Sequence, residues 1–176
     1  YNVVGGVVTF MSFINASMTS ATQRFLAFDL GKGDIKQYQR TFSMTINVFM
    51  ILCLIMLIIL EILGPWFVAN KLVIPDERLT AAQWIFQFSI LSFIFSTMTI
   101  PFQSAIVSYE KMGIYAYFTF IDVGSKLLIC LFLYILPIDR LITYGFIQMC
   151  IVLVILIINY TYCRSKLNGC VYKHYW

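Results

Sequence analysis

Residues 41–60 read TFSMTINVFMILCLIMLIIL, a run of twenty positions without one charged side chain. A helix rises about 1.5 Å per residue, so about 20 apolar residues span the hydrocarbon core of a bilayer. The apolar character continues past Glu61, and we expect the Gly64-Pro65 pair to close the helix. The stretch therefore predicts a transmembrane helix over residues 41–67.

Four further stretches have a comparable length and apolar content: residues 2–28, 82–108, 113–136 and 141–163. Strands of a membrane barrel are segments of roughly ten residues with alternating polarity, whereas these stretches are longer and unbroken. The polar turns between them are short, which favours antiparallel neighbours. The sequence thus predicts an all-α fold. We expect a polytopic bundle of five transmembrane helices in a single partial transmembrane domain, followed by a tail over 164–176.

The composition supports this class. Hydrophobic residues make up 61% of the chain and charged residues 11%, with a mean hydropathy of +0.86. A soluble domain carries about 25% charged residues, so this chain lacks the polar groups to cover a surface in water. Its net charge of +4 is spread over the loops without a basic face, which excludes a nucleic-acid partner. The five cysteines lie mostly in apolar runs, and we interpret them as thiols packed like small hydrophobic residues.

The basic residues of alternate loops predict the orientation, because cytoplasmic loops are enriched in lysine and arginine. The richer side holds Arg24, Lys32, Lys36, Arg40, Lys111, Arg164, Lys166 and Lys173; the poorer side holds Lys71, Arg78 and Arg140. We therefore expect the Gly31 loop, the Lys111 loop and the C-terminal tail to be cytoplasmic. The first helix then runs inward, so we expect another helix before it and the chain to be a fragment.

Asp122 and Lys126 are the strongest functional candidates, because they lie in the middle of the helix predicted over 113–136. A charged side chain at the bilayer centre costs about 2.5–3.5 kcal/mol on insertion scales and usually faces a bundle interior or a water-filled cavity. The i, i+4 spacing places both on one face, together with Tyr115 and Thr119. One interpretation is a charged element lining a translocation pathway. The other is a self-neutralised pair that eases insertion or docks a neighbouring helix.

A second polar stripe lies on the helix predicted over 2–28. Its members fall within an arc of about 100° on that helix; they are Ser12, Asn15, Thr19, Thr22 and Gln23. Small and hydroxyl side chains also pack membrane helices against each other. The stripe, and Asn15, Thr19 and Gln23 in particular, therefore predicts either a pathway lining or a close helix contact.

Three isolated residues carry further expectations. Glu61 lies near the outer end of the second helix and, with Asp122, is a candidate for coupling to a proton or cation, although it could also reach the membrane interface. Pro101 predicts a kink in the third helix. Arg24 points away from the polar stripe, and we expect it to anchor the helix at the headgroups.

The patterns of several enzyme classes are absent from the sequence. Gly31-Lys32-Gly33 lacks the spacing of a phosphate-binding loop. His174 is the single histidine and lies in the tail, so no serine or cysteine in the membrane has a histidine base. We expect a protein that is not an enzyme, without a metal site or a cofactor.

Several motifs together resemble one family. They are Gly5-Gly6, SFIN at 12–15, SATQRFL at 20–26, LGKGD at 30–34, PFQSA at 101–105 and YEKM at 109–112. In order and topology the chain resembles helices two to six of bacterial polysaccharide transporters. These are the O-antigen or lipopolysaccharide flippases of the multidrug/oligosaccharidyl-lipid/polysaccharide exporter (MATE-like) superfamily.

The resemblance implies one lobe of a V-shaped, two-lobed transporter with a central cationic cavity. Its substrate would be a polyprenyl-pyrophosphate-linked oligosaccharide, moved across the bacterial inner membrane with a proton or sodium gradient as the driving force. Lys126 would supply positive charge to that cavity, and Asp122 would cancel part of it. The implied partners are the lipid bilayer, the lipid-linked saccharide and the remaining helices of the full-length transporter.

Two alternatives remain open. The first is a cation-coupled multidrug efflux transporter of the same superfamily, in which Asp122 or Glu61 would hold the cation. The second is a membrane scaffold subunit that transports nothing.

Overall fold

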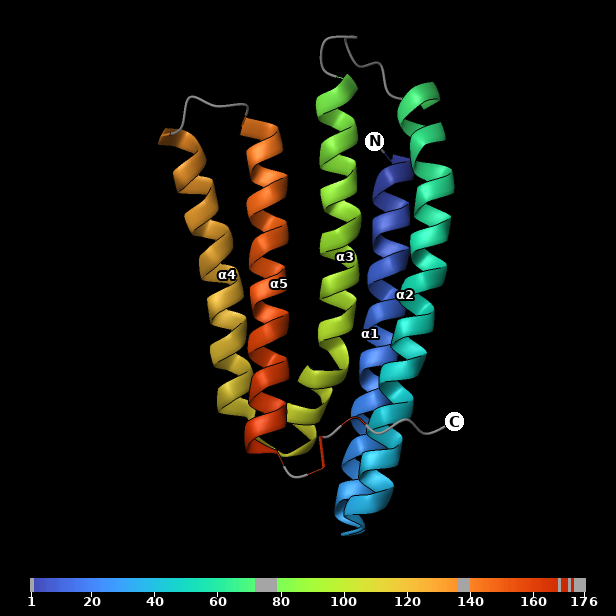
Figure 1. Cartoon of the computed structure of the whole chain (residues 1–176), viewed down its shortest axis with the longest axis vertical. Helices are drawn as coiled ribbons and strands as arrows, with labels where there is room; N and C mark the ends of the chain where they lie inside the picture. Colours follow the sequence, from blue (N-terminus) through green and yellow to red (C-terminus); the bar gives the residue numbers. More distant parts are fainter. Residues whose placement is uncertain (1, 72–78, 136–139, 168, 171, 173–176) are drawn as a thin grey trace.

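The chain folds into five helices, as the sequence predicts. The computed structural model describes residues 2–71, 79–135, 140–167, 169–170 and 172. Within these residues the helices are α1 (Asn2–Gly31), α2 (Ile35–Lys71), α3 (Leu79–Ser108), α4 (Met112–Ile135) and α5 (Arg140–Lys166), and no strand is present (Figure 1). The all-α fold is confirmed.

Four helices are long and apolar enough to cross a membrane. The stretches concerned are Ile35–Ile62 in α2, Gln83–Ser108 in α3, Met112–Ile129 in α4 and Thr143–Lys166 in α5. Large apolar side chains on them are exposed, among them Leu54 at 63% and Phe120 at 77%. Apolar patches of this extent mark a surface that meets lipid or other helices, so the chain is a helical membrane protein. The side chains of residues 2–12 lie outside the described part, and the membrane span expected in α1 stays a prediction.

The helices extend beyond the predicted boundaries. The expected second helix, 41–67, is α2 from Ile35 to Lys71, which runs through Gly64-Pro65 without a break, and α5 ends at Lys166 rather than at residue 163. The predicted ends followed hydropathy, which falls where charged residues begin. Backbone hydrogen bonding continues through these residues, and neighbouring groups allow glycine and proline inside membrane helices.

The turn between α1 and α2 shows why α2 begins as early as Ile35. Asp34 is its N-cap, because Asp34 Oδ1 accepts hydrogen bonds from the backbone N–H groups of Lys36 at 3.0 Å and Gln37 at 3.2 Å. Gly33 has a φ of 74°, the left-handed conformation that commonly follows a helix C-terminus. The left-handed Gly33 therefore follows the end of α1 at Gly31.

The turn between α3 and α4 has the same left-handed geometry without a glycine. Glu110 has a φ of 57°. Its N–H donates to the carbonyl of Val107 at 2.9 Å, and the N–H of Lys111 donates to the carbonyl of Ile106 at 3.3 Å. These two bonds form a Schellman motif with Glu110 at the position that glycine usually occupies.

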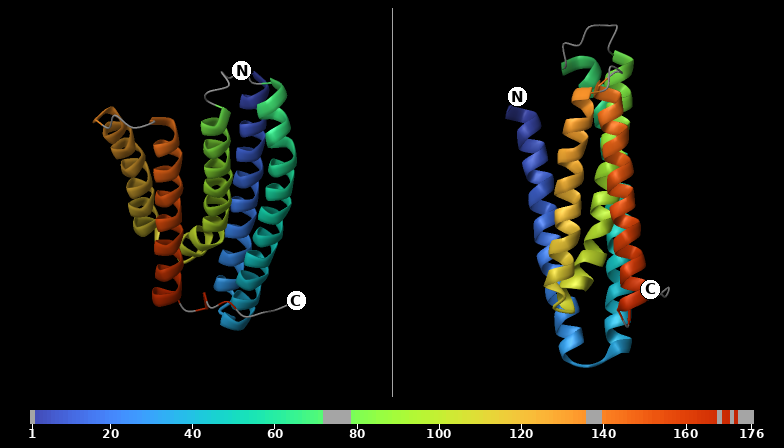
Figure 2. Two further views of the ribbon diagram at one scale, coloured as in Figure 1. Left: turned by 45° about the horizontal axis from the view of Figure 1, so that its top comes forward. Right: turned by 90° about the vertical axis from the view of Figure 1, so that its left-hand side faces the viewer.

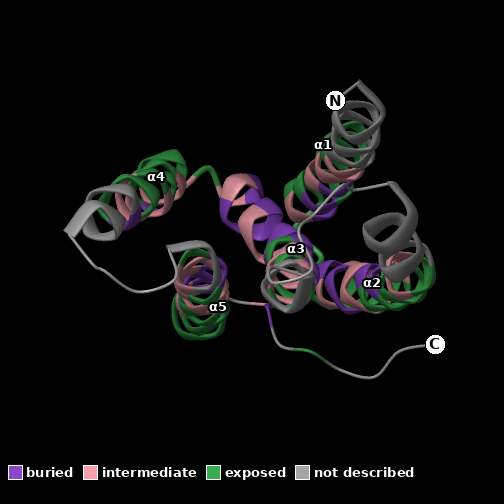
Figure 3. Cartoon of the chain, turned by 90° about the horizontal axis from the view of Figure 1, so that it is seen from above, coloured by how far each residue is buried: buried purple, intermediate pink, exposed green. Residues whose placement is uncertain are grey.

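Most of the buried side chains gather at one end of the bundle. We call it the basic end, because it carries Lys32, Lys36, Arg40, Lys111, Arg164 and Lys166. The core there joins helices α1 to α5 and the tail; it consists of Leu26, Tyr38, Phe42, Ala105, Ile106, Phe118, Cys163, Leu167 and Cys170. Edge-to-face aromatic pairs reinforce it, with ring centroids 5.5 Å apart for Tyr38–Tyr109 and 5.8 Å apart for Phe118–Tyr162. Figure 3 shows how the buried residues cluster around α3.

The helices separate towards the opposite end. In Figure 1, α4 and α5 lean away from α1, α2 and α3 at the top of the view, and Figure 2 shows the same divergence. Pro101 lies inside α3, and near it the helix bends towards the base of α4 (Figure 1). Proline has no N–H for the helical hydrogen bond and pushes away the carbonyl four residues earlier, so the kink expected at Pro101 has its physical cause.

Some sequence expectations fall on side chains outside the described part. They concern Ser12, Lys71, Arg78, Arg140, Lys173 and His174.

Candidate functional site

Asp122 and Lys126 form an ion pair in the middle of α4. Lys126 Nζ lies 2.7 Å from Asp122 Oδ2, and the two side chains are 49% and 30% exposed, the lysine being the more exposed. It is the single ion pair among the side chains that the structure describes. The pair is thus self-neutralised, as one interpretation expected, but it is not enclosed by protein.

The pair lies on a definite flank of α4. Ile121 and Ser125 line an apolar hollow of about 320 Å³ between α4 and α5. Asp122 and Lys126 each follow one of these residues, so they lie about 100° further around the helix. They therefore lie on a flank of α4, roughly at right angles to the side that faces α5.

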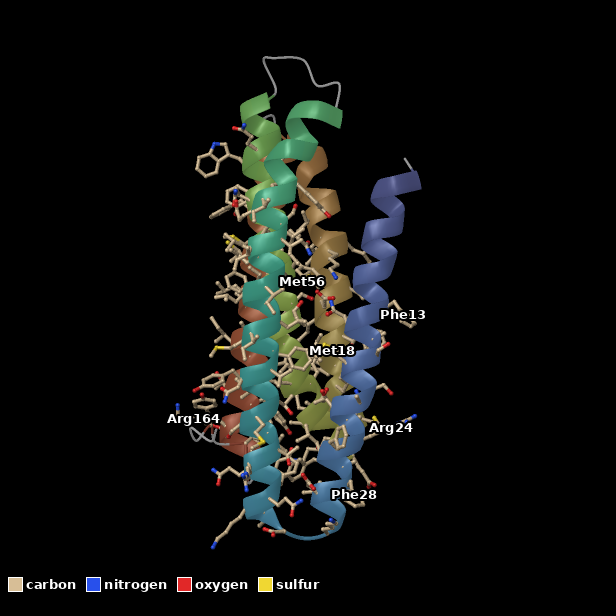
Figure 4. The ribbon with its side chains drawn as sticks, turned by 90° about the vertical axis from the view of Figure 1, so that its right-hand side faces the viewer. Phe13, Met18, Arg24, Phe28, Met56 and Arg164 are labelled. Carbon is tan, nitrogen blue, oxygen red and sulfur yellow. The ribbon has the colours of Figure 1, made fainter. Side chains whose placement is uncertain are left out.

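The polar stripe of α1 lies on the packed side of that helix. Thr22 is buried, at 8% exposed, and Asn15, Thr19 and Gln23 are partly buried. Thr19 Oγ1 donates to the backbone carbonyl of Asn15 at 2.7 Å. Arg24 points away from the bundle in Figure 4, in agreement with an anchor at the headgroups.

The direction of this stripe follows from Asp29, which contacts α2. Thr19 and Gln23 lie about 80° and 120° around α1 from Asp29, and so on a flank roughly at right angles to the side that faces α2. In Figure 3, α1 lies above α3, α4 to its upper left and α2 directly to its right.

No hydrogen bond or ion pair joins the polar stripes of α1 and α4 among the described side chains. Among the described residues, α1 and α4 do not contact each other, so the structure does not bring the two stripes together.

Glu61 is separate from this region. Gln87 Nε2 on α3 donates to Glu61 Oε2 at 3.2 Å. The helix continues for ten residues beyond Glu61, to Lys71, a rise of about 15 Å. The candidate membrane stretch of α2 ends at Ile62, so the expectation that Glu61 reaches the interface stays a prediction. Glu61 shares no partner with Asp122, the other candidate for ion coupling.

Asp29 is a polar residue of α1 that the sequence interpretation missed. It is 5% exposed, and its two carboxylate oxygens accept hydrogen bonds from Gln37 Nε2, at 3.2 Å, and from Thr41 Oγ1. An acidic residue in the last turn of a helix is unfavourable next to the helix dipole. The position of Asp29 in the last turn could therefore have predicted that its carboxylate needs hydrogen-bond donors from a neighbouring helix.

Asn159 on α5 was also missed. It is fully buried; its Nδ2 donates to the carbonyl of Ile155 at 2.8 Å, and its Oδ1 has no partner among the described residues. It lies beside Phe118 and Ile121 of α4. An asparagine within an apolar helix was the signal, since such side chains commonly bond across membrane helices.

The thiols of Cys163 and Cys170 are buried in the core, in line with the interpretation of the cysteines as small hydrophobic residues. The hydrogen bond with the Cys163 thiol lowers the pKa of Cys170, which lies in the tail beyond α5. Burial raises the pKa of Tyr109 in the turn after α3. Among the described residues, no group of three or more potential metal ligands is present.

The fold and the polar stripes together define the class, a helical membrane protein with polar and charged residues inside its membrane-spanning part. Comparison with protein-family models, with curated proteins and with solved structures found no match.

Proposed function

We propose that the chain forms part of a transmembrane transporter for a lipid-linked oligosaccharide. The observation that carries the proposal is the Asp122–Lys126 pair, half-exposed at the middle of α4 on a flank beside the side that faces α5. An exposed charged pair is costly when it faces hydrocarbon and is stable where water or a polar substrate surrounds it. The flank therefore suits the wall of an aqueous pathway.

The polar stripe of α1 supports the same pathway. Asn15 and Gln23 are partly buried, and neither side chain has a hydrogen-bond partner among the described residues. Together with Lys126 they offer amide and ammonium donors, which suit the hydroxyl groups and the pyrophosphate of a polyprenyl-pyrophosphate-linked saccharide.

The direction and setting follow from the loop charges and the family resemblance. The basic end would face the cytoplasm of a bacterium, and the protein would lie in its inner membrane. The remaining helices of the full-length transporter would complete the pathway, and a proton or sodium gradient would drive it.

A glycan-export assay in the intact protein tests the proposal. Lys126→Ala is expected to lose most export of surface glycan at an unchanged level in the membrane, and Lys126→Arg to keep it, because arginine retains the charge. Arg24→Ala is the matched control, since Arg24 points away from the bundle (Figure 4). Export at the wild-type rate by Lys126→Ala would contradict the role of this lysine and favour a scaffold subunit.

The Glu61–Gln87 contact favours a second candidate, a cation-coupled multidrug efflux transporter. A carboxylate in an apolar helix pair can take up a proton or a cation. In that case Glu61→Gln abolishes drug resistance and Lys126→Ala does not. The same two variants, assayed for drug resistance and for glycan export, separate the two functions.

A further inference from the structure

We propose that the first turns of α2 form a binding site for the headgroup of an anionic phospholipid, with an acyl chain along the exposed face of the same helix. The site lies at the basic end and shares no residue with the polar stripes. It is independent of the proposed transport function.

The headgroup part of the site is a surface hollow of about 650 Å³. It is lined by Asp34, Lys36, Gln37, Arg40, Thr41 and Met44. These residues open the stretch Ile35–Ile62, the longest apolar stretch of the described chain. Where such a stretch begins, a membrane helix enters the headgroup layer. The hollow is thus at the depth of lipid phosphates.

Two cations in the hollow are free to bind an anion. Lys36 and Arg40 are exposed and lie one turn apart on the same face. Neither has an ion-pair partner among the described side chains, where Asp122–Lys126 is the single pair.

The acidic residues nearby are already engaged. Asp34 Oδ1 caps α2 through the N–H groups of Lys36 and Gln37, where the helix dipole offsets its charge. The Gln37 amide and the Thr41 hydroxyl donate to Asp29. The groups left for a ligand are therefore the ammonium of Lys36 and the guanidinium of Arg40, which suit a phosphate diester.

An exposed apolar face continues from these cations along α2. It consists of Met44, Val48, Ile51, Ile55, Ile58 and Ile62, which are 36–67% exposed. From Met44 to Ile55 the helix rises about 17 Å, roughly half of the hydrocarbon thickness of about 30 Å. That is the depth of one leaflet, so the acyl chain of a lipid with its headgroup bound in the hollow would lie against this face.

The two cations and the apolar face together point to one kind of ligand, an anionic phospholipid. A free phosphate would use the two cations and leave the apolar face uncovered, whereas a neutral lipid would cover the face and leave the cations without an anion. A phospholipid with a net negative headgroup satisfies both, because basic residues at the membrane surface attract anionic lipids. Phosphatidylglycerol is the simplest probe of this class.

Native mass spectrometry of the full chain in detergent tests the proposal, after titration with phosphatidylglycerol or phosphatidylcholine. We expect the wild type to retain phosphatidylglycerol in preference to phosphatidylcholine. Lys36→Gln/Arg40→Gln should lower retention about thirtyfold, from the loss of two cations at the membrane surface. Lys36→Arg/Arg40→Lys should retain the lipid.

The matched control is Arg164→Gln/Lys166→Gln, which removes the same charge from exposed positions at the basic end of α5. This control should retain phosphatidylglycerol like the wild type. An equal loss of retention in the control would show that only general charge attraction binds the lipid, and would overturn the proposed site. Displacement of the lipid by excess glycerol 3-phosphate would show that the headgroup alone binds, against a role for the apolar face. A dimer mass in place of lipid adducts would assign this face to a second copy.

Discussion

The basic end and the middle of the bundle both contain polar side chains within helices, but these side chains differ in burial and in their hydrogen-bond partners. In the core of the basic end, two polar groups are buried and bonded between helices: Asp29 to Gln37 and Thr41, and the Tyr38 hydroxyl to Ser108 at 3.3 Å. In the middle, the charged pair of α4 bonds only within its own helix and stays half-exposed. Buried polar groups with partners hold one structure together. Exposed groups without partners on other helices are available to a ligand.

The difference predicts a division of labour along the bundle axis. Substitutions of buried residues in the core of the basic end should lower stability, whereas substitutions of the charged pair in the middle should change transport and leave stability nearly unchanged. Unfolding of the chain in mixed detergent micelles, followed by circular dichroism, measures the stability part.

Phe42→Ala should have the largest effect on stability. Phe42 is 1% exposed and packs between Tyr38 and Phe102. Removing a buried phenylalanine leaves a cavity and costs about 3–5 kcal/mol. Phe120→Ala is the control, because this side chain is 77% exposed on α4. Equal losses in the two variants would show that the core at the basic end is not the main source of stability.

Asp29→Ala should follow, with a loss of about 1.5–3 kcal/mol for hydrogen bonds to a charged acceptor. The substitution leaves the Gln37 amide and the Thr41 hydroxyl without their acceptor and weakens the link between α1 and α2. Asp29→Asn keeps one acceptor oxygen, so its stability should lie between that of the wild type and that of Asp29→Ala. A loss below that of an exposed substitution would mean that water replaces the carboxylate at no cost.

Asp34→Ala should cost about 1 kcal/mol, the usual effect of removing an N-cap. Asp34→Ser keeps an acceptor for the N–H groups of Lys36 and Gln37 and should lose only a few tenths. The same unfolding experiment distinguishes the two. If serine and alanine behave alike, the cap does not stabilise α2.

Hydropathy was enough to predict the number and type of the helices, because a bilayer requires each span to satisfy its own backbone hydrogen bonds. It did not predict their ends, since the caps depend on single side chains such as Asp34. The pairing of Asp122 with Lys126 was predictable from the i, i+4 spacing, because both residues belong to one helix. The hydrogen-bond partners of Asp29 and Glu61 could not be predicted, since those partners lie on neighbouring helices. Their positions depend on how the helices are rotated against each other.

Glu110→Gly tests the turn at the basic end and should stabilise the chain slightly. Glu110 holds a φ of 57°, where a residue with a Cβ is strained by about 1–2 kcal/mol. Glycine removes that strain but gains freedom in the unfolded chain, so a net gain of about 0.5 kcal/mol is expected. Glu110→Ala removes the carboxylate and keeps the strain, so it should bring no gain. A gain in both variants would assign the effect to charge.

Asp122→Leu/Lys126→Leu should have the smallest effect on stability and tests the middle of the bundle directly. The pair makes no bond to another helix, and replacing an ion pair by apolar residues of similar volume is often neutral or stabilising. We expect a change in unfolding free energy below about 0.5 kcal/mol, the size typical of an exposed pair. Glycan export of the intact protein should be lost in the same variant. A large loss of stability would make the pair a structural contact. Unchanged stability together with unchanged export would leave the scaffold alternative as the function of the chain.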